Sequence, residues 1–229
     1  MKTAGLVGGL GPESTIDYYR RIFDAWGRTQ PTTSPSLVID SIDVTRAMHL
    51  VQTDRVALVA YLLASVHRLA GAGVDFIAIT ANTPHIAFDE VAAQSPRPLI
   101  SIVEVCAAEA QRLQLRRPLL LGTRFTVEAD FYPKVFARHG IDIAIPNEND
   151  RGWVHDRYVG ELLKGDFRDT TREQLVALVE RLRNELSIDS VILGGTELPL
   201  LLKASTLAGL PVLDTTALHV KSIVERMLS

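Results

Sequence analysis

Two stretches of this chain share one pattern, and that pattern restricts the fold more than any other feature of the sequence. Each is an apolar, strand-like run that ends at small polar residues before a helix-like segment: 77–85 (IAITANTPH) and 191–199 (VILGGTELP). Ala81 and Gly195 hold equivalent places, 114 residues apart (195 minus 81). Open parallel α/β sheets bind ligands at the carboxyl ends of their strands. The pattern therefore predicts an internal duplication with polar side chains at two strand ends.

Strand-like runs alternate with amphipathic segments along the whole chain. This alternation favours βαβ units and parallel sheets. We predict an α/β fold of two similar lobes, each with a short parallel sheet flanked by helices, related by a pseudo-twofold duplication, with the site in the cleft between the lobes. Among the predicted elements are helices at 54–72, 126–139, 153–163 and 171–186, and strands at 37–40 and 141–145.

Composition excludes several classes of function. The chain has 229 residues, 47% of them apolar, and a net charge of −3, which gives no reason to expect nucleic acid or a membrane surface as a partner. No apolar run approaches the ~18 residues of a membrane span, and the N-terminus has no signal-peptide pattern. We therefore expect a cytoplasmic protein. The single cysteine, Cys106, excludes an intramolecular disulfide and a cysteine metal cluster, and we interpret it as a small buried hydrophobic residue.

The longer motifs resemble one known family. The resemblance to the aspartate/glutamate racemases, which are cofactor-independent isomerases, covers nearly the whole chain. It is carried by residues 1–19 (MKTAGLVGGLGPESTIDYY), 121–132 (LGTRFTVEADFY), 191–202 (VILGGTELPLLL) and 212–219 (VLDTTALH).

The resemblance implies how the chain is divided and what it uses. It implies that the last helix returns to the first lobe, so we predict residues 1–100 plus 206–229 for one lobe and residues 101–205 for the other. It also implies an acidic amino acid or a related dicarboxylate as ligand, no cofactor and no metal, and it is compatible with a homodimer.

The chain departs from the family at two positions. The family has Cys-Asn-Thr where this chain has Ala81-Asn82-Thr83, and Gly-Cys-Thr-Glu where it has Gly194-Gly195-Thr196-Glu197. Neither Ala81 nor Gly195 can accept a proton. Racemisation by two thiols is therefore not available to this chain. The loss is large, because a positioned acid or base contributes ~10²–10⁴-fold in rate.

Neutral hydrogen-bond donors remain at the strand ends. Asn82, Thr83 and Thr196 could hold a carboxylate, although Asn and Thr are also common as helix caps. The glycine-rich turn at 8–12 does not fit the G-x-G-x-x-G spacing. The residues alone fit a tight strand-to-helix turn and a carboxylate-binding turn equally well. The resemblance favours a carboxylate-binding turn, which includes Gly9 and leads to Ser14.

The resemblance adds two more residues of the substrate site. Lys164 lies in a stretch similar to the one whose lysine receives the distal carboxylate of the substrate, and Thr126 lies in the second glycine-turn motif. From its own surroundings, Lys164 is typical of a solvated lysine near the end of a helix. Arg46 and Arg124 are alternative cationic anchors.

Two ionisable residues beside the motifs are the candidates for catalysis. His85 and Glu197 each follow a motif threonine within two positions. Either could be an acid or a base if it points into the site. A structural role is the alternative for both, as a neutral hydrogen-bonding imidazole and as a carboxylate at the start of a helix.

Three hypotheses follow from the missing thiols. The first is a family enzyme with thiol-independent chemistry: a lyase, decarboxylase, cyclase or isomerase. The second is a carboxylate-binding homologue without turnover. The third is a racemase whose two cysteines were removed by engineering. We favour the first.

Overall fold

The computed structural model describes residues 1–229 and divides the chain into two compact units. Unit 1 comprises residues 1–102 and 216–229, and unit 2 comprises residues 103–215. Residues 206–215, which we had placed in the first lobe, thus belong to unit 2. The reason is strand pairing, because β8 (Leu210–Asp214) pairs in parallel with β6 (Ser190–Leu193).

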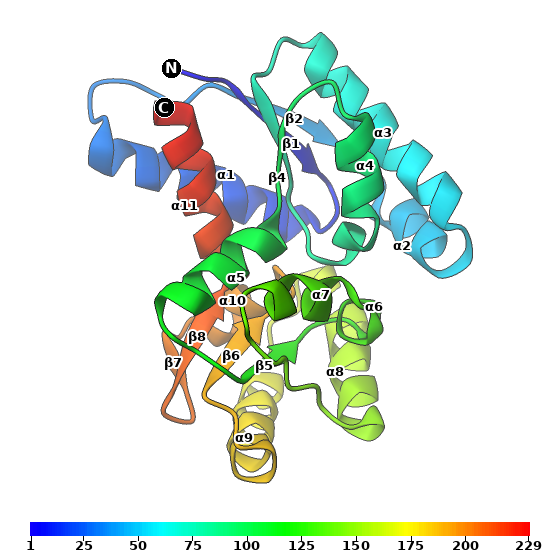
Figure 1. Ribbon diagram of the computed structural model, residues 1–229, viewed down its shortest axis with the longest axis vertical. Helices are drawn as coiled ribbons and strands as arrows, with labels where there is room; N and C mark the ends of the chain where they lie inside the picture. Colours follow the sequence, from blue (N-terminus) through cyan, green and yellow to red (C-terminus); the bar gives the residue numbers. More distant parts are fainter. The chain divides into compact units, whose positions relative to one another are not determined.

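Unit 1 has a four-stranded parallel sheet in the order β2-β1-β3-β4. In chain order (Figure 1), its elements are β1 (Ala4–Gly8), α1 (Pro12–Thr29), β2 (Leu37–Ser41), α2 (Val44–Thr53), α3 (Arg55–Gly71), β3 (Phe76–Ile79), the 3₁₀ helix η1 (Thr83–Ala87), α4 (Phe88–Gln94), β4 (Leu99–Ile100) and the last helix α11 (Thr215–Leu228).

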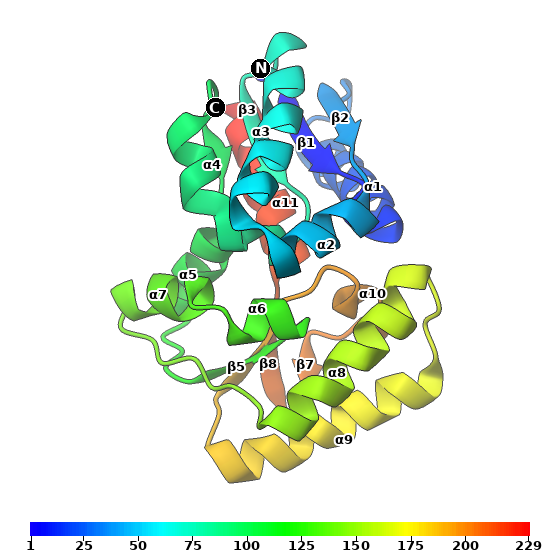
Figure 2. The same cartoon turned by 90° about the vertical axis from the view of Figure 1, so that its right-hand side faces the viewer.

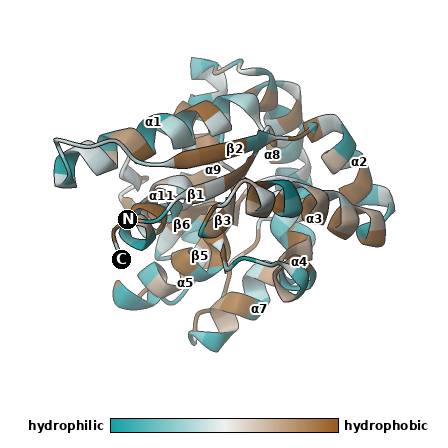
Figure 3. Cartoon of the chain, turned by 90° about the horizontal axis from the view of Figure 1, so that it is seen from above, coloured by the Kyte–Doolittle hydropathy of each residue, from teal (hydrophilic) through white to brown (hydrophobic).

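The central strands β1 and β3 of unit 1 are buried on both faces, whereas the edge strand β2 is partly exposed. Alternate residues of a strand point to opposite faces, so Val7 packs with the helices α2 to α4, whereas Leu6 packs with α1 and α11. In Figure 3 the strands β2 and β3 are largely brown, whereas the helices around them carry both teal and brown segments. A parallel sheet covered on both faces explains why its strands are continuous apolar runs.

Unit 2 has a sheet in the order β5-β6-β8-β7, parallel except for its last pair. Its elements (Figure 2) are α5 (Ile102–Arg112), β5 (Pro118–Leu121), α6 (Arg124–Glu128), α7 (Phe131–Arg138), α8 (Glu148–Gly160), the 3₁₀ helix η2 (Leu162–Lys164), α9 (Asp169–Leu186), β6, α10 (Leu198–Leu202), β7 (Thr206–Leu207) and β8.

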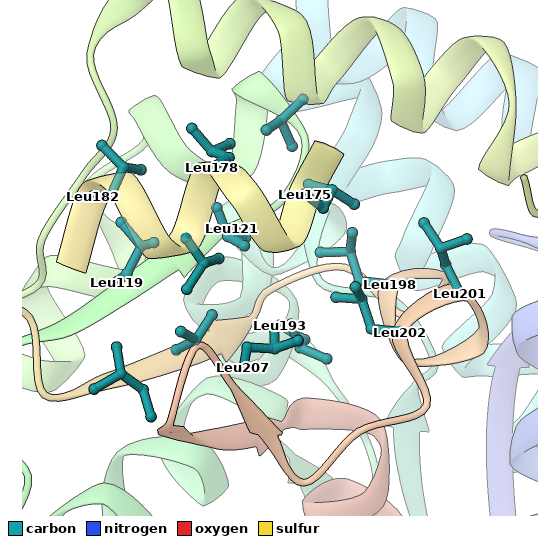
Figure 4. Packing of buried hydrophobic residues seen from close by; sticks show 14 of the residues in the cluster. Leu119, Leu121, Leu175, Leu178, Leu182, Leu193, Leu198, Leu201, Leu202 and Leu207 are labelled. Carbon is teal, nitrogen blue, oxygen red and sulfur yellow. The ribbon is translucent and has the colours of Figure 1, made fainter. Parts of the chain in front are cut away.

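Leucine side chains fill the core between α9 and this sheet. Leu175, Leu178 and Leu182 lie on one face of α9, at helical spacing. Figure 4 shows them beside the leucines of β5 and β6, with those of α10 and β7 near by. This apolar face fixes the position of β6, which carries the second motif.

The two units repeat one strand order. In unit 2, residue Ala144 forms an isolated parallel bridge with Leu119 of β5, at the place that β2 holds beside β1. β5, β6 and β8 then follow as β1, β3 and β4 do. β3 begins at residue 76 and β6 at residue 190, again 114 apart. The topology therefore agrees with the duplication that the motifs predicted.

Two predicted elements differ in the structure. The helix predicted at 126–139 is two helices, with an extended residue at Ala129. Pro133 explains the break, because its ring collides with the carbonyl four residues earlier in a continuous helix. The strand predicted at 141–145 is reduced to the bridge at Ala144, immediately before Pro146. None of the helices has both the length and the apolar character that a membrane crossing requires.

Candidate functional site

The polar residues of the first motif lie at the carboxyl edge of the sheet in unit 1. β1 and β3 pair in parallel with Val7 opposite Ile79, so the segments that follow them leave the sheet at the same edge. Asn82 and Thr83 follow β3 and are buried. Ser14 follows β1 and is fully buried as well. The structure thus brings three of the predicted binding residues to one edge.

Close packing in the glycine-rich turn requires glycine at residue 9. This residue has a φ of 78°, and a Cβ atom there would collide with the carbonyl of Ile42. Its backbone N–H donates to Thr15 Oγ1 at 2.9 Å. The turn therefore has a structural function through Thr15, and the role of Gly9 in binding a carboxylate stays a prediction.

Three buried hydroxyl groups in unit 1 have no hydrogen-bond partner. Two of them stand at helix starts, Ser14 in α1 and Thr216 in α11, and the third is Ser65 within α3. Burial of a hydroxyl group without a hydrogen-bond partner costs free energy. The two such groups at helix starts are therefore candidates for binding a ligand. Thr216 was absent from the predicted site because its sequence context indicated only a helix start.

His85 is buried and both of its ring nitrogens are occupied. Nδ1 lies 2.8 Å from the carbonyl of Ala81, and Nε2 accepts the N–H of Ile102 at 3.2 Å. The imidazole must therefore be neutral with its proton on Nδ1, and burial lowers its pKa to about 4. This geometry favours the structural role for His85. Its predicted catalytic role remains an untested hypothesis.

His219 makes a similar arrangement from α11. Its Nδ1 lies 2.9 Å from Tyr18 Oη and its Nε2 lies 3.2 Å from the carbonyl of Ile100. Burial, and then the nearby His85, lower the pKa of His219 to about 3. Together the two neutral histidines fix the segment 100–102 that leads into α5.

The second motif lies at the carboxyl edge of the sheet in unit 2. β5 and β6 pair with Leu121 opposite Leu193, and buried Thr126 and Thr196 follow these two strands. The backbones approach closely there, since a Cβ at Gly194 would lie 2.9 Å from the carbonyl of Leu121. Thr126 and Thr196 thus lie at one sheet edge, as Ser14 and Thr83 do in the other unit.

A tyrosine occupies the space beside Gly195. A Cβ atom at Gly195 would lie 2.7 Å from Oη and 2.8 Å from Cζ of Tyr158, which is a buried residue of α8. Tyr158 Oη donates a short hydrogen bond to Glu197 Oε2 and accepts the Glu197 N–H at 3.4 Å. Thr196 Oγ1 donates to the same carboxylate oxygen at 3.2 Å. Sequence reasoning missed Tyr158, because no local pattern marks it.

The environment of Tyr158 keeps its phenol protonated. Burial raises the pKa of Tyr158 well above its usual value, and the negative charge of Glu197 raises it further. Glu197, which we predicted as a candidate acid or base, is 1% exposed and lies within this hydrogen-bonded group. The side chains of Tyr158, Thr196 and Glu197 therefore form one buried polar cluster at the end of β6.

Lys164 lies apart from this buried cluster. It is exposed at the end of η2. The neighbouring Glu161 is buried and accepts hydrogen bonds from Thr171 Oγ1 at 2.5 Å and Arg157 Nη1 at 2.7 Å. Glu161 thus anchors the turn that carries Lys164. Of the alternative cations, Arg46 lies over the ring of Tyr61.

No thiol is available at either strand end. Ala81 offers a methyl group and Gly195 a hydrogen. Cys106 is fully buried in α5, and burial raises the pKa of its thiol, with the charge of Asp214 adding to the effect. This confirms the interpretation of Cys106 as a buried hydrophobic residue. No group of three histidine, cysteine, aspartate or glutamate side chains is arranged to hold a metal ion.

Comparison with known proteins gives consistent matches over the full length. The model of the Asp/Glu/hydantoin racemase family matches residues 7–223. The broad specificity amino-acid racemase RacX of Bacillus subtilis (strain 168) is 25% identical over 231 residues, 98% of each chain. Among solved structures, an aspartate racemase homologue from Pyrococcus horikoshii OT3 is 32% identical with a TM-score of 0.83, and an Asp/Glu racemase candidate from Yersinia pestis is 31% identical with a TM-score of 0.89, each over 100% of both chains.

The fold and the polar strand ends define a duplicated α/β protein of the kind seen in amino-acid racemases. The chain belongs to the Asp/Glu/hydantoin racemase family.

Proposed function

We propose that this protein is an enzyme of the family that binds an acidic amino acid or a related dicarboxylate and performs thiol-independent chemistry at the carbon beside a carboxylate. The observation that carries the proposal is the pair Ala81 and Gly195, at the two positions where the family has its cysteines. A reaction that needs a thiol on each face of one carbon has no donor or acceptor here. RacX of Bacillus subtilis is an amino-acid racemase and the Pyrococcus horikoshii protein is an aspartate racemase homologue, so the proposal concerns a change of chemistry on a shared fold.

Retained polar groups support ligand binding. The unpartnered hydroxyl of Ser14 lies at the same sheet edge as buried Asn82 and Thr83 in unit 1. Thr126 and Thr196 take the corresponding places in unit 2. Neutral donors at buried strand ends suit a carboxylate, since each hydrogen bond to a charged acceptor contributes about 1.5–3 kcal/mol. Lys164 is proposed for the distal carboxylate.

The reaction classes that fit are those with less demanding proton transfer than racemisation. A decarboxylase or another lyase needs one proton donor, whereas an intramolecular cyclisation needs mainly positioning. An isomerase that uses other groups than thiols is the fourth class. We propose that no cofactor takes part, that the protein acts in the cytoplasm, and that a homodimer is compatible with this function.

The test is turnover in D₂O. The wild-type protein is incubated with both enantiomers of aspartate and glutamate, and with malonate, succinate and 2-methylmalonate. Substrate and product are followed by NMR, and binding by calorimetry. We expect at least one probe to yield product or to gain deuterium at the reacting carbon. Binding without any turnover would instead identify a carboxylate-binding homologue.

The packing at residue 195 tests the hypothesis that two cysteines were removed from a racemase by engineering. If the cysteines had been removed from an ordinary racemase, the space for a thiol at residue 195 would remain empty. Tyr158 fills that space, and this observation disfavours a racemase altered only at residues 81 and 195. Racemisation restored by Ala81→Cys with Gly195→Cys alone would favour engineering.

A further inference from the structure

The ring of Tyr158 lies in the region that a thiol on residue 195 would reach. Its phenol oxygen is 2.7 Å from the point where the Cβ of residue 195 would stand. The backbone at Gly195 does not have the positive φ that requires glycine. A side chain at residue 195 and the aromatic ring of Tyr158 cannot occupy the same space, so the position of the ring requires glycine there.

The hydrogen bonds of the phenol hold its oxygen beside Gly195 and direct its proton to Glu197. Tyr158 Oη donates to Glu197 Oε2 and accepts the N–H of Glu197 at 3.4 Å. Thr196, the motif residue next to Gly195, donates to the same carboxylate oxygen. The phenol is thus an ionisable O–H group close to the place of a side chain at residue 195, and its partner carboxylate is fixed by a second hydrogen bond.

We propose that Tyr158 is the proton donor of the reaction, in place of the family thiol at residue 195. This inference rests on the proposed function, since it requires turnover at a carbon atom. A simple filling of space by the ring is the alternative, and it predicts that the hydroxyl group itself has no effect on turnover.

The step is a single protonation of carbon. When a carboxylate leaves as CO₂, or another group leaves, its bonding electron pair stays on the substrate carbon. The phenol O–H turns from Glu197 to the substrate carbon. Its proton forms the new C–H bond with that electron pair, and the O–H electron pair stays on the phenol oxygen. The N–H of Glu197 faces the resulting phenolate, which recovers its proton from solvent water. The nearby Glu197 charge favours that return, because two adjacent buried negative charges repel.

The experiment compares Tyr158→Phe with wild type in the D₂O assay, using the same seven probes. Phenylalanine keeps the ring and removes only the donor. We expect deuterium incorporation into product to fall by about 100-fold or more, while the calorimetric dissociation constant and the melting temperature stay close to those of wild type. Tyr132→Phe, which removes a hydroxyl from another buried tyrosine of unit 2, is the matched control and should retain wild-type turnover.

The results for wild type and Tyr158→Phe test the role of Tyr158 separately from the proposed function. If wild type turns over a probe and Tyr158→Phe does so equally well, the role of Tyr158 is overturned and the proposed function stays intact. A wild type that turns over none of the probes would overturn the proposed function, and the inference with it.

A second variant decides the question if Tyr158→Phe does not fold. Leucine lacks the ring atoms that would collide with a side chain at residue 195, so Tyr158→Leu combined with Gly195→Cys exchanges the phenol for a thiol. We expect this variant to incorporate deuterium and to lose that activity on alkylation with iodoacetamide. Wild type should resist alkylation because Cys106 is buried. A folded exchange variant that binds a probe and stays inert would contradict the proposal.

Discussion

Gly195 is the residue at which packing and chemistry meet. Its missing side chain leaves room for the ring of Tyr158, whose phenol binds Glu197. A side chain at residue 195 and this ring exclude each other, so the glycine and the tyrosine depend on one another.

We therefore expect Gly195→Cys to destabilise the protein. Overpacking a well-packed site costs about 1–3 kcal/mol, and adding Tyr158→Leu should recover most of that loss. Gly152→Cys on α8 is the control, because a Cβ there meets nothing within 4 Å. Urea unfolding measures all three variants. A Gly195→Cys protein as stable as wild type would show that the ring moves aside at little cost.

Lys164 is the residue for which the family resemblance and the local environment differ most. It is exposed, yet we propose that it binds the distal carboxylate. Lys164→Met should then weaken binding of a dicarboxylate probe by about 1.5–3 kcal/mol, roughly 10-fold or more in dissociation constant. Lys203→Met, at another exposed lysine of unit 2, is the calorimetric control. Unchanged affinity in Lys164→Met would remove Lys164 from the site.

At the scale of elements, two neutral histidines hold the junction of β4 and α5. The pKa of His85 is about 4 and that of His219 about 3, both lowered chiefly by burial. An unfolded histidine has a pKa of about 6.5, so unfolding takes up protons in mild acid. The stability that comes from the neutral forms is complete above about pH 6.5 and is lost as the pH falls toward about 4.

Urea unfolding between about pH 6 and pH 5 should therefore show a steep loss of stability. Each histidine contributes a slope approaching about 1.4 kcal/mol per pH unit. His85→Asn should remove about half of the combined slope, whereas His67→Asn, at an exposed histidine of α3, should leave it unchanged. A stability that does not change over this interval would contradict the assignment of both histidines as buried and neutral.

The turn between α8 and α9 depends on one buried carboxylate. Hydrogen bonds from Thr171 and Arg157 lower the pKa of Glu161, so it is ionised at neutral pH. Glu161→Gln removes the charge and should cost about 1.5–3 kcal/mol in urea unfolding at neutral pH. Glu173→Gln, at an exposed site of α9, should change stability by less than about 0.5 kcal/mol. Equal stabilities of the two variants would show that the Glu161 contacts are of little importance.

At the scale of the whole molecule, the sequence predicted the architecture better than the site. Apolar runs before polar motifs predicted β3 and β6, because fully buried parallel strands require such runs. The strand at 141–145 was overpredicted, since its alternation resembles a strand but only Ala144 pairs. Tyr158 could not be predicted, because it lies far from Gly195 along the chain and the two meet only where α8 approaches the segment that follows β6.

The measurement that tests the account most directly is racemisation by the unmodified protein. Each enantiomer of aspartate and glutamate is incubated with wild type and analysed by chiral chromatography. Because Ala81 and Gly195 offer no thiol and Tyr158 is a single donor, we predict no appreciable conversion of either enantiomer into the other. Efficient racemisation by wild type would contradict this account, since it would require a pair of acid–base groups on opposite faces of the reacting carbon.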